Sequence, residues 1–496
     1  MPNIAMLALA IGIFLPTLLL ATRLGRARWL PARILRALLK SLRLLSIVIL
    51  VLGFRPFAVA FAETYPFTAV GVAVLGLVPA VRGRKTARAR VLTASIGLVA
   101  IFTPVLIVWM SFFNIHYDYA ADCAKVAEVP RIRLLFSQCQ PGWADEVRKA
   151  IGTDAKLTNA RHSRVTFQAA DPDYLYLGTG LEENRDRDHV LVRLHVPTAT
   201  VDRIYATSAV FGGGCDPETK RCLALLSADS AYLVIDDVTG AIVARGDLPA
   251  RPRFAGIHDH WGMMALSGPP HVARVDLSTG EWSPPPAPVA DAILANMGEP
   301  GYGYLGNDRA ADDVFVCSDE PSMSTMWPEH LEPERIREWG RPGPIARVSF
   351  DFAHVRFGTL PLADGFWSLL MCNGLVAERD RNRLYFVATL AGEVLVLDYD
   401  TFEPRGRIPL AVGVRSGDLD RAGRRLFIPN YATGWMSVVD LESLREVDRL
   451  FVGRGGRWVE YDSRRDVVYV ASRAGFLEVD VHGLGVTGTP VTGAPH

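Results

Sequence analysis

The sequence lacks the short motifs by which many enzymes are recognised. It contains no nucleophile elbow of the Gly-x-Ser-x-Gly type, no phosphate-cradling glycine loop and no His-Glu-x-x-His zinc motif. It also lacks Cys-x-x-Cys-His, which argues against covalently attached haem. These absences make an enzyme the less favoured class without excluding one. We expect no catalytic residues of a familiar pattern and no cofactor.

Acidic residues are almost absent from residues 1–114, which contain 13 Lys and Arg but a single acid, Glu63. The same region holds four long apolar stretches, each near the roughly 20 residues that a helix needs to cross a bilayer. They run from Ile4 to Ala21, from Leu44 to Ala62, from Tyr65 to Val81 and from Val91 to Phe113. We therefore predict an N-terminal α-helical transmembrane domain of four spans, in contact with membrane lipid.

The basic residues of this region predict its orientation. They fill the loop between the first two stretches and the loop between the last two, and basic loops stay on the cytoplasmic side. Both termini then face outwards, which places the rest of the chain on the periplasmic or extracellular side of the cytoplasmic membrane. Arg55 lies inside the second stretch beside Pro56, where a charge is costly. It either pairs with a partner subunit or a lipid phosphate, or it reaches the outer interface.

Positive charge is in deficit after position 114, where 40 Lys and Arg stand against 52 Asp and Glu. Binding to nucleic acid needs a basic footprint, so this part of the chain is not expected to bind it.

No cysteine occurs in the predicted membrane region. All six lie after it, and an even number on one side of a membrane is typical of disulfides in an oxidising compartment. Six unrelated buried thiols are the alternative. We expect pairing in chain order, although six cysteines allow 15 connectivities. The expected pairs are Cys123–Cys139, Cys215–Cys222 and Cys317–Cys372.

A repeat with a period near 42 residues is the strongest pattern in the sequence. Three copies of an apolar run, a glycine turn and a second apolar run ending in Asp are found in the C-terminal third. The terminal residues are Asp398, Asp440 and Asp480, which are 42 and 40 residues apart. Each copy predicts two hairpin-linked strands.

Two tallies of this repeat agree on seven units. The strand-end position recurs in Asp236 and Asp276 and, in degenerate form, in Val-Arg-Leu-His195 and Ala-Arg-Val-Ser349. A polar turn is expected in each unit, with candidates at Asp171, Asp216, Asp259, Asp308, Asp380, Asp420 and Asp462. We predict an all-β seven-bladed β-propeller over residues 161–496. Residues 115–160 are interpreted as a linker, and whether residues 131–138 close the ring is left open.

The three clear copies, among them Leu426-Phe-Ile-Pro-Asn-Tyr-Ala-Thr-Gly-Trp-Met-Ser-Val-Val-Asp440, resemble the YVTN repeat of surface-layer and periplasmic seven-bladed propellers. The resemblance is good over roughly residues 375–482, loose over 160–350, and does not cover the membrane region. It implies a propeller exported from the cytoplasm. It implies no single activity, since this fold hosts binding proteins, lyases, lactonases and redox subunits.

Two features are candidates for a site. The insertion between Ser318 and Pro344 carries apolar side chains that suggest a partner-binding surface, with packing on the propeller's own rim as the alternative. These side chains are Met323, Met326, Trp327 and Trp339. His258 and His260 would share a face if they lay in a strand, where they could bind a metal with a third ligand. They coincide with a predicted turn, which weakens that hypothesis.

The preferred function is a membrane-anchored protein-binding or scaffolding subunit that engages another envelope protein. A propeller enzyme, lactonase-like or lyase-like, is the alternative. A ligand sensor is a third hypothesis, but no cytoplasmic output domain is visible.

Overall fold

The computed structural model describes residues 119–137, 165–180, 189–208, 210–297, 303–307, 312–318, 344–360, 372–389, 392–411 and 413–485. The chain divides into two compact units, Met1–Tyr117 and Asp118–His496, and the described residues all belong to the second. The four predicted spans and Arg55 lie outside them. Among the described residues, no helix combines the length and the hydrophobicity needed to span a bilayer.

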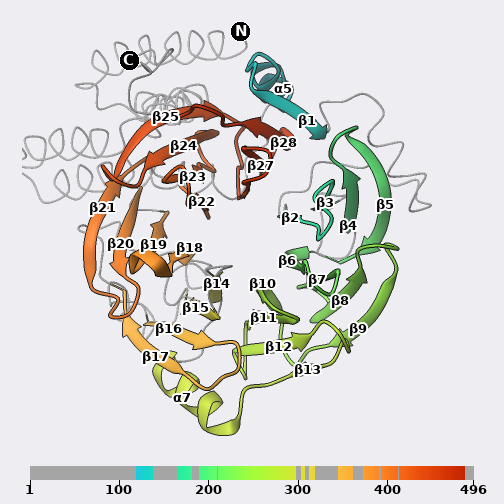
Figure 1. Cartoon of the computed structure of the whole chain (residues 1–496), viewed down its shortest axis with the longest axis vertical. Coiled ribbons are helices and arrows are strands. Elements are labelled where there is room, and N and C mark those ends of the chain that lie inside the picture. The colour runs from blue at the N-terminus through green and yellow to red at the C-terminus, as the bar shows by residue number, and fades with distance from the viewer. Residues whose placement is uncertain are drawn as a thin grey trace, which may run out of the picture. The chain divides into compact units, whose positions relative to one another are not determined.

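Seven sheets, each of four antiparallel strands, surround a common centre (Figure 1). Blades one to three are β2 (Val165–Gln168), β3 (Tyr174–Gly180), β4 (His189–His195) and β5 (Thr200–Thr207); β6 (Val210–Asp216), β7 (Arg221–Leu226), β8 (Ala231–Asp236) and β9 (Ile242–Asp247); and β10 (Pro252–His258), β11 (Trp261–Leu266), β12 (Val272–Asp276) and β13 (Trp282–Ser283). Blades four and five are β14 (Gly303–Asn307), β15 (Asp313–Ser318), β16 (Pro344–Ser349) and β17 (Val355–Thr359); and β18 (Cys372–Glu378), β19 (Arg383–Ala388), β20 (Glu393–Asp398) and β21 (Pro404–Pro409). Blades six and seven are β22 (Asp418–Asp420), β23 (Arg425–Pro429), β24 (Trp435–Asp440) and β25 (Arg445–Phe451); and β26 (Trp458–Asp462), β27 (Val467–Ser472), β28 (Gly475–Asp480) and β1 (Ile132–Phe136). The predicted seven-bladed propeller is confirmed.

The ring is closed by β1, which supplies the outermost strand of blade seven. It pairs with β28 in antiparallel register, with Leu134 opposite Leu477. Arg133 strengthens the pairing, because its Nη2 lies 2.7 Å from Glu478 Oε2. A strand from the beginning of the described region thus completes a sheet formed by its end, which ties the two ends of the ring together.

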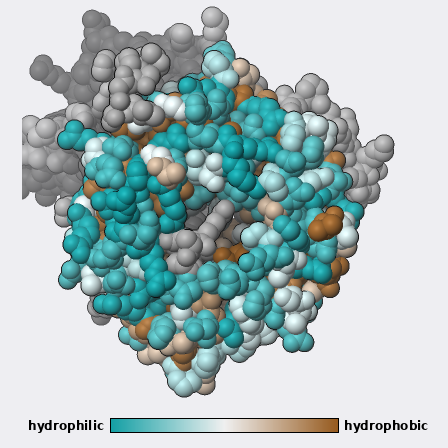
Figure 2. All heavy atoms as spheres, in the orientation of Figure 1, coloured by the Kyte–Doolittle hydropathy of each residue, from teal (hydrophilic) through white to brown (hydrophobic). Residues whose placement is uncertain are grey.

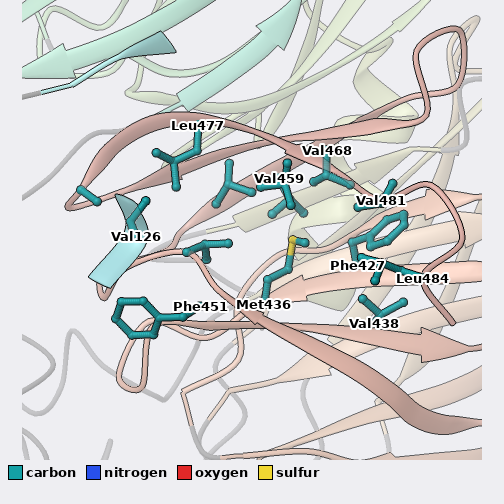
Figure 3. Packing of buried hydrophobic residues seen from close by; sticks show 14 residues of the cluster. Val126, Phe427, Met436, Val438, Phe451, Val459, Val468, Leu477, Val481 and Leu484 are labelled. Carbon is teal, nitrogen blue, oxygen red and sulfur yellow. The ribbon is translucent and has the colours of Figure 1, made fainter. Parts of the chain in front are cut away.

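The core lies between neighbouring blades. Central strands such as β27 are buried along their whole length, whereas outermost strands such as β9 are largely exposed. Figure 3 shows the packing of blades six and seven, where Phe427 and Met436 meet Val468 and Leu477. Burying each such side chain stabilises the folded state by about 1.5–3 kcal/mol.

The antiparallel order within each blade gives the ring two distinct faces. The turns between strands one and two and between strands three and four lie on one face, which we call the turn face. The turns between strands two and three, and the connections from blade to blade, lie on the opposite face, which we call the crossover face.

The predicted strand-end residues all lie on the turn face. His195, Asp236, Asp276, Ser349, Asp398, Asp440 and Asp480 each end the third strand of a blade. Asp236 illustrates how an aspartate ends such a strand. Its Oδ1 accepts the backbone N–H of Thr239 at 2.8 Å and so fixes the turn that follows. The second set of predicted turns also lies between strands one and two, except for Asp308, which is outside the described residues.

Arginines join neighbouring blades on the turn face at six of the seven junctions. Each guanidinium reaches a carboxylate or a turn carbonyl of the next blade. The contacts are Arg193 Nε–Asp237 Oδ1 (3.3 Å), Arg274 Nη1–Phe350 O (2.8 Å), Arg347 Nη1–Asp400 Oδ1 (2.5 Å), Arg383 Nη1–Leu441 O (2.8 Å), Arg425 Nη1–Val481 O (2.6 Å) and Arg133 Nη2–Val196 O (2.9 Å). At the remaining junction the Tyr232 hydroxyl donates to Gly280 O at 2.7 Å.

Two local features complete the fold. Helix α7 (Ala287–Met297) follows the very short β13 and packs on blade four, burying Ile293 and Met297. The predicted disulfide Cys215–Cys222 is confirmed and closes the first hairpin of blade two.

Two further cysteines, Cys123 and Cys317, are also disulfide-bonded. Their predicted partners, Cys139 and the side chain of Cys372, lie outside the described part of the chain. These two pairings therefore stay predictions.

Candidate functional site

The residues predicted to bind a partner, Met323, Met326, Trp327 and Trp339, lie outside the described residues. The insertion that carries them does lie where it was predicted in the topology, because β15 ends at Ser318 and β16 begins at Pro344. It therefore connects strands two and three of blade four, and both of its ends are on the crossover face.

The two histidines considered as metal ligands do not lie on one strand. His258 ends β10, Asp259 takes a left-handed turn conformation with φ of 50°, and His260 precedes β11. The rings pack on different aromatic neighbours, with His258 at 5.5 Å from Phe350 and His260 at 4.9 Å from Trp261. The shared strand face assumed for metal binding does not occur, and within the described residues no group of three potential metal ligands is found.

A cluster of three arginines around one tyrosine is the most unusual polar arrangement of the described region. The Cζ atoms of Arg415, Arg457 and Arg473 lie 5.2, 5.3 and 5.6 Å from the ring centroid of Tyr431. Arg473 Nη2 donates a hydrogen bond to the Tyr431 hydroxyl at 3.1 Å. Tyr431, Arg473 and Arg415 are only 3, 4 and 6% exposed, and Arg457 is half-buried. We call these four residues the Arg–Tyr cluster.

The repeat explains why the four residues meet. Arg415 and Arg457 occupy equivalent positions 42 residues apart, each just before the first strand of a blade. Tyr431 and Arg473 are also 42 residues apart, each in a turn between strands two and three. Both kinds of position lie on the crossover face, so blades six and seven bring one pair from each repeat to the same place.

Backbone contacts hold the cluster in position. Arg457 N donates to Ala471 O at 3.0 Å, and Gly455 N donates to Tyr431 O at 2.8 Å. Gly455 has φ of 70°, and a Cβ there would lie 2.5 Å from Cγ of Arg473. Only glycine therefore allows the connection between blades to pass so close to the Arg473 side chain.

The charges of the cluster change the chemistry of its tyrosine. Burial by itself raises the pKa of the Tyr431 hydroxyl, but the positive charges of Arg457, Arg473 and Arg415 and the hydrogen bond from Arg473 outweigh burial and lower the pKa to about 8. Burial beside Glu378 instead raises the pKa of Tyr385 to about 12. The three arginines thus favour the charged form of the Tyr431 hydroxyl.

An aromatic pair lies beside the cluster at the centre of the ring. Trp458, which follows Arg457, stacks on Phe254 with ring centroids 5.6 Å apart. Phe254 belongs to β10, across the ring from blade seven (Figure 1). Trp458 also packs on the hydrophobic clusters of blades seven and one, one and two, and three and four, so it fills the centre of the ring near the crossover face. Figure 2 shows the ring hollowed at its centre, with hydrophobic surface in the hollow.

Helix α5 (Tyr119–Ala127) is fixed to the crossover face of blades six and seven. The buried Asp122 accepts the backbone N–H of Arg454 at 3.1 Å, and its carboxylate lies 3.4 Å from Arg454 Nε. Lys125 Nζ lies 4.0 Å from the ring centroid of Phe451, and Val126 is completely buried. The chain therefore enters the propeller at the face that carries the Arg–Tyr cluster.

A second surface is apolar. Among the described residues four large hydrophobic side chains are exposed, and three of them lie within six residues of one hairpin in blade two. They are Val238, Ile242 and Val243, which are 75, 49 and 48% exposed. We call them the blade-two patch. Val238 lies in the turn between β8 and β9, on the turn face.

No protein-family model matches the chain, and no curated protein matches it. Solved structures that align with it include hydrazine synthase of Kuenenia stuttgartiensis, at 12% sequence identity and a TM-score of 0.47, over 65% of this chain and 94% of that one. The β-propeller domain of Cps50 (Swd1) from Myceliophteria thermophila aligns at 11% identity and a TM-score of 0.47, over 65% of this chain and 97% of that one. These likenesses concern the fold alone, and the resemblance to YVTN-repeat proteins stays a prediction.

Proposed function

We propose that this chain is a membrane-anchored, extracytoplasmic propeller that binds another envelope protein through the blade-two patch. The observation that carries the proposal is the clustering of exposed apolar side chains. Single exposed hydrophobic residues are ordinary on a protein surface, but a contiguous group of them is typical of a contact surface. Here three of the four in the described region share one hairpin.

The position of the patch favours a protein as the ligand. Val238, Ile242 and Val243 lie on the outermost hairpin of a blade, at the rim of the ring. Small molecules bind in concave sites that bury most of their surface, whereas proteins dock on such rims. Each Å² of apolar surface covered by the partner would stabilise the complex by about 25 cal/mol before the costs of association.

The sequence supports the membrane attachment. Helix α5 begins at Tyr119, and five residues separate it from Phe113, where the last predicted span ends. Five residues extend at most about 18 Å. The insertion residues Met323, Met326, Trp327 and Trp339 form a second proposed contact.

Site-specific photocrosslinking in native membranes tests the partner surface. A photoreactive residue at position 238 or 243 is expected to give the same discrete protein adduct. The control position is 259, where Asp259 is exposed on the same face, and it is expected to give none. Val243→Asp should abolish the adduct formed from position 238. Identical labelling from all three positions would contradict the proposal.

A reporter fusion after His496 tests the membrane orientation separately. We expect reporter activity outside the cytoplasm, and activity confined to the cytosol would overturn the predicted topology.

A further inference from the structure

We propose that Asp237 is a positioning residue for the blade-two patch, and that it orients the turn which presents Val238 to the partner. The inference rests on the proposed function, because it concerns how the proposed contact surface is built. Asp237 is only 2% exposed, so it acts through the neighbouring Val238 and does not touch the partner itself.

The repeat shows what is unusual about Asp237. In every blade one buried residue directly follows the end of the third strand. In six blades this residue has a hydrocarbon or aromatic side chain that is at most 4% exposed. These six residues are Val196, Leu277, Phe350, Tyr399, Leu441 and Val481. In blade two an aspartate takes the place of the apolar anchor.

The next residue departs from the repeat in the opposite sense. Val238 follows Asp237 and is 75% exposed. Five of the other six blades carry a polar or charged residue at this exposed position, namely Ser278, Asp351, Asp400, Glu442 and His482. Blade two thus inverts the pattern at two adjacent positions, with a charged residue inside and an apolar residue outside.

Stability of the fold does not explain this exchange. Removing a carboxylate from water is costly, and replacing a buried ion pair by apolar residues is often neutral or stabilising. The six apolar anchors show that the architecture accepts such a residue at this position. A position that breaks the local rule at a cost in stability is expected at a functional site.

Blade one holds the Asp237 carboxylate through three groups. The Tyr176 hydroxyl donates to Oδ1 at 3.0 Å, Arg193 Nε lies 3.3 Å from the same oxygen, and the backbone N–H of Asp171 donates to Oδ2 at 2.8 Å. Hydrogen bonds weaken steeply when they are misaligned, whereas apolar contacts have no preferred direction. The carboxylate therefore fixes the orientation of the turn more tightly than an apolar anchor does.

The other end of the turn is also held by blade one. The carbonyl oxygen of Gly240 accepts hydrogen bonds from Arg203 Nη1 and from the Tyr205 hydroxyl, both at 2.8 Å. Val238 lies between these two fixed points. A turn that is ordered before the partner docks loses little conformational freedom on binding, which favours the complex.

The first test gives blade two the apolar anchor of the other blades. Asp237→Leu leaves Arg193 paired with Asp202 at 2.6 Å. Crosslinking in native membranes uses a photoreactive residue at position 243, so that Val238 and its turn stay unmodified. We expect the adduct yield to fall about twofold to tenfold, while the midpoint of denaturant unfolding of the full chain stays unchanged or rises. A residue that only stabilised the fold would lower both.

A matched pair of tyrosines covers the case in which Asp237→Leu does not fold. Tyr176→Phe removes the hydroxyl that donates to Asp237 at 3.0 Å, and Tyr399→Phe removes a hydroxyl that donates to Asp313 at 3.1 Å, between blades four and five. Both tyrosines are buried, so we expect similar losses of stability. Only Tyr176→Phe should lower the adduct yield from position 243.

Equal adduct yields in the wild type and in Asp237→Leu would overturn this inference while the proposed function stands. Equal yields in Tyr176→Phe and Tyr399→Phe would do the same. The absence of any adduct in the wild type would instead overturn the proposed function, and this inference with it.

Discussion

The two faces of the ring use arginine in different ways. On the turn face, arginines such as Arg193 and Arg425 each bridge two blades and end on a carboxylate or a carbonyl of the neighbouring blade. On the crossover face, Arg415, Arg457 and Arg473 gather around a single tyrosine. The arginines of the turn face hold neighbouring blades together, whereas the three around Tyr431 lower the pKa of its hydroxyl.

The comparison teaches that position within the repeat decides the role of a residue. Arg193, Arg274 and Arg347 all stand two residues before the end of the third strand, where the next blade offers a turn to bind. Arg415 and Arg457 stand before the first strand, where the chain crosses between blades. The same side chain stabilises the ring at one place and forms a candidate site at the other.

The largest effect is expected where a turn-face arginine is removed. Arg425 Nε lies 2.7 Å from Oδ2 of the buried Asp420, and Arg425 Nη2 lies 2.6 Å from Asp466 Oδ1. Arg425→Ala leaves the Asp420 carboxylate buried without this cation, which costs about 3–5 kcal/mol. Denaturant unfolding of the full chain measures the loss.

Arg457→Ala is the matched change on the crossover face. Arg457 is half-buried and its guanidinium lies near two other arginines, so we expect the free energy of unfolding to fall by less than in Arg425→Ala. Equal losses of unfolding free energy in Arg425→Ala and Arg457→Ala would contradict the difference between the two faces.

A smaller effect is expected at two glycines with the same backbone conformation. Gly455 on the crossover face and Gly483 on the turn face have φ of 70° and 71°, so alanine at either position costs roughly 1–2 kcal/mol. A Cβ at position 455 would also collide with Arg473, whereas a Cβ at position 483 has no atom within 4 Å. Denaturant unfolding of both variants separates the backbone effect from the steric effect. Gly455→Ala should lose more stability than Gly483→Ala, and equal losses would contradict the steric account.

Much of the fold could be predicted because each blade repeats the same local signals. Asp236, Asp276 and Asp398 end strands because an Asp side chain can accept the next turn's N–H groups, and that chemistry is local. Ring closure could not be predicted in this way. The pairing of Ile132 with Val479 joins residues far apart in the sequence, and the short β1 carries no copy of the repeat.

The candidate site was harder to predict, although a signal existed. Aligning the repeats places Arg415 with Arg457 and Tyr431 with Arg473, but only the three-dimensional arrangement of adjacent blades brings the two pairs together. The pair His258 and His260 shows the opposite case. The spacing suits a strand, and the left-handed Asp259 between them removes the shared face.

The smallest effect is spectroscopic and compares two tyrosines. The pKa of Tyr431 is lowered to about 8, below the ordinary 10.0, whereas that of Tyr385, which donates to Glu378 at 2.9 Å, is raised to about 12. Titration of phenolate absorbance should show one tyrosine ionising near pH 8, absent from Tyr431→Phe and still present in Tyr385→Phe. Because the folded state holds the phenolate of Tyr431 better than the unfolded state does, this tyrosine stabilises the fold fully above about pH 10, and that contribution is lost as the pH falls through 8. If no tyrosine ionised near pH 8, the three arginines would not govern Tyr431, and the contrast between the two faces would lose its clearest chemical consequence.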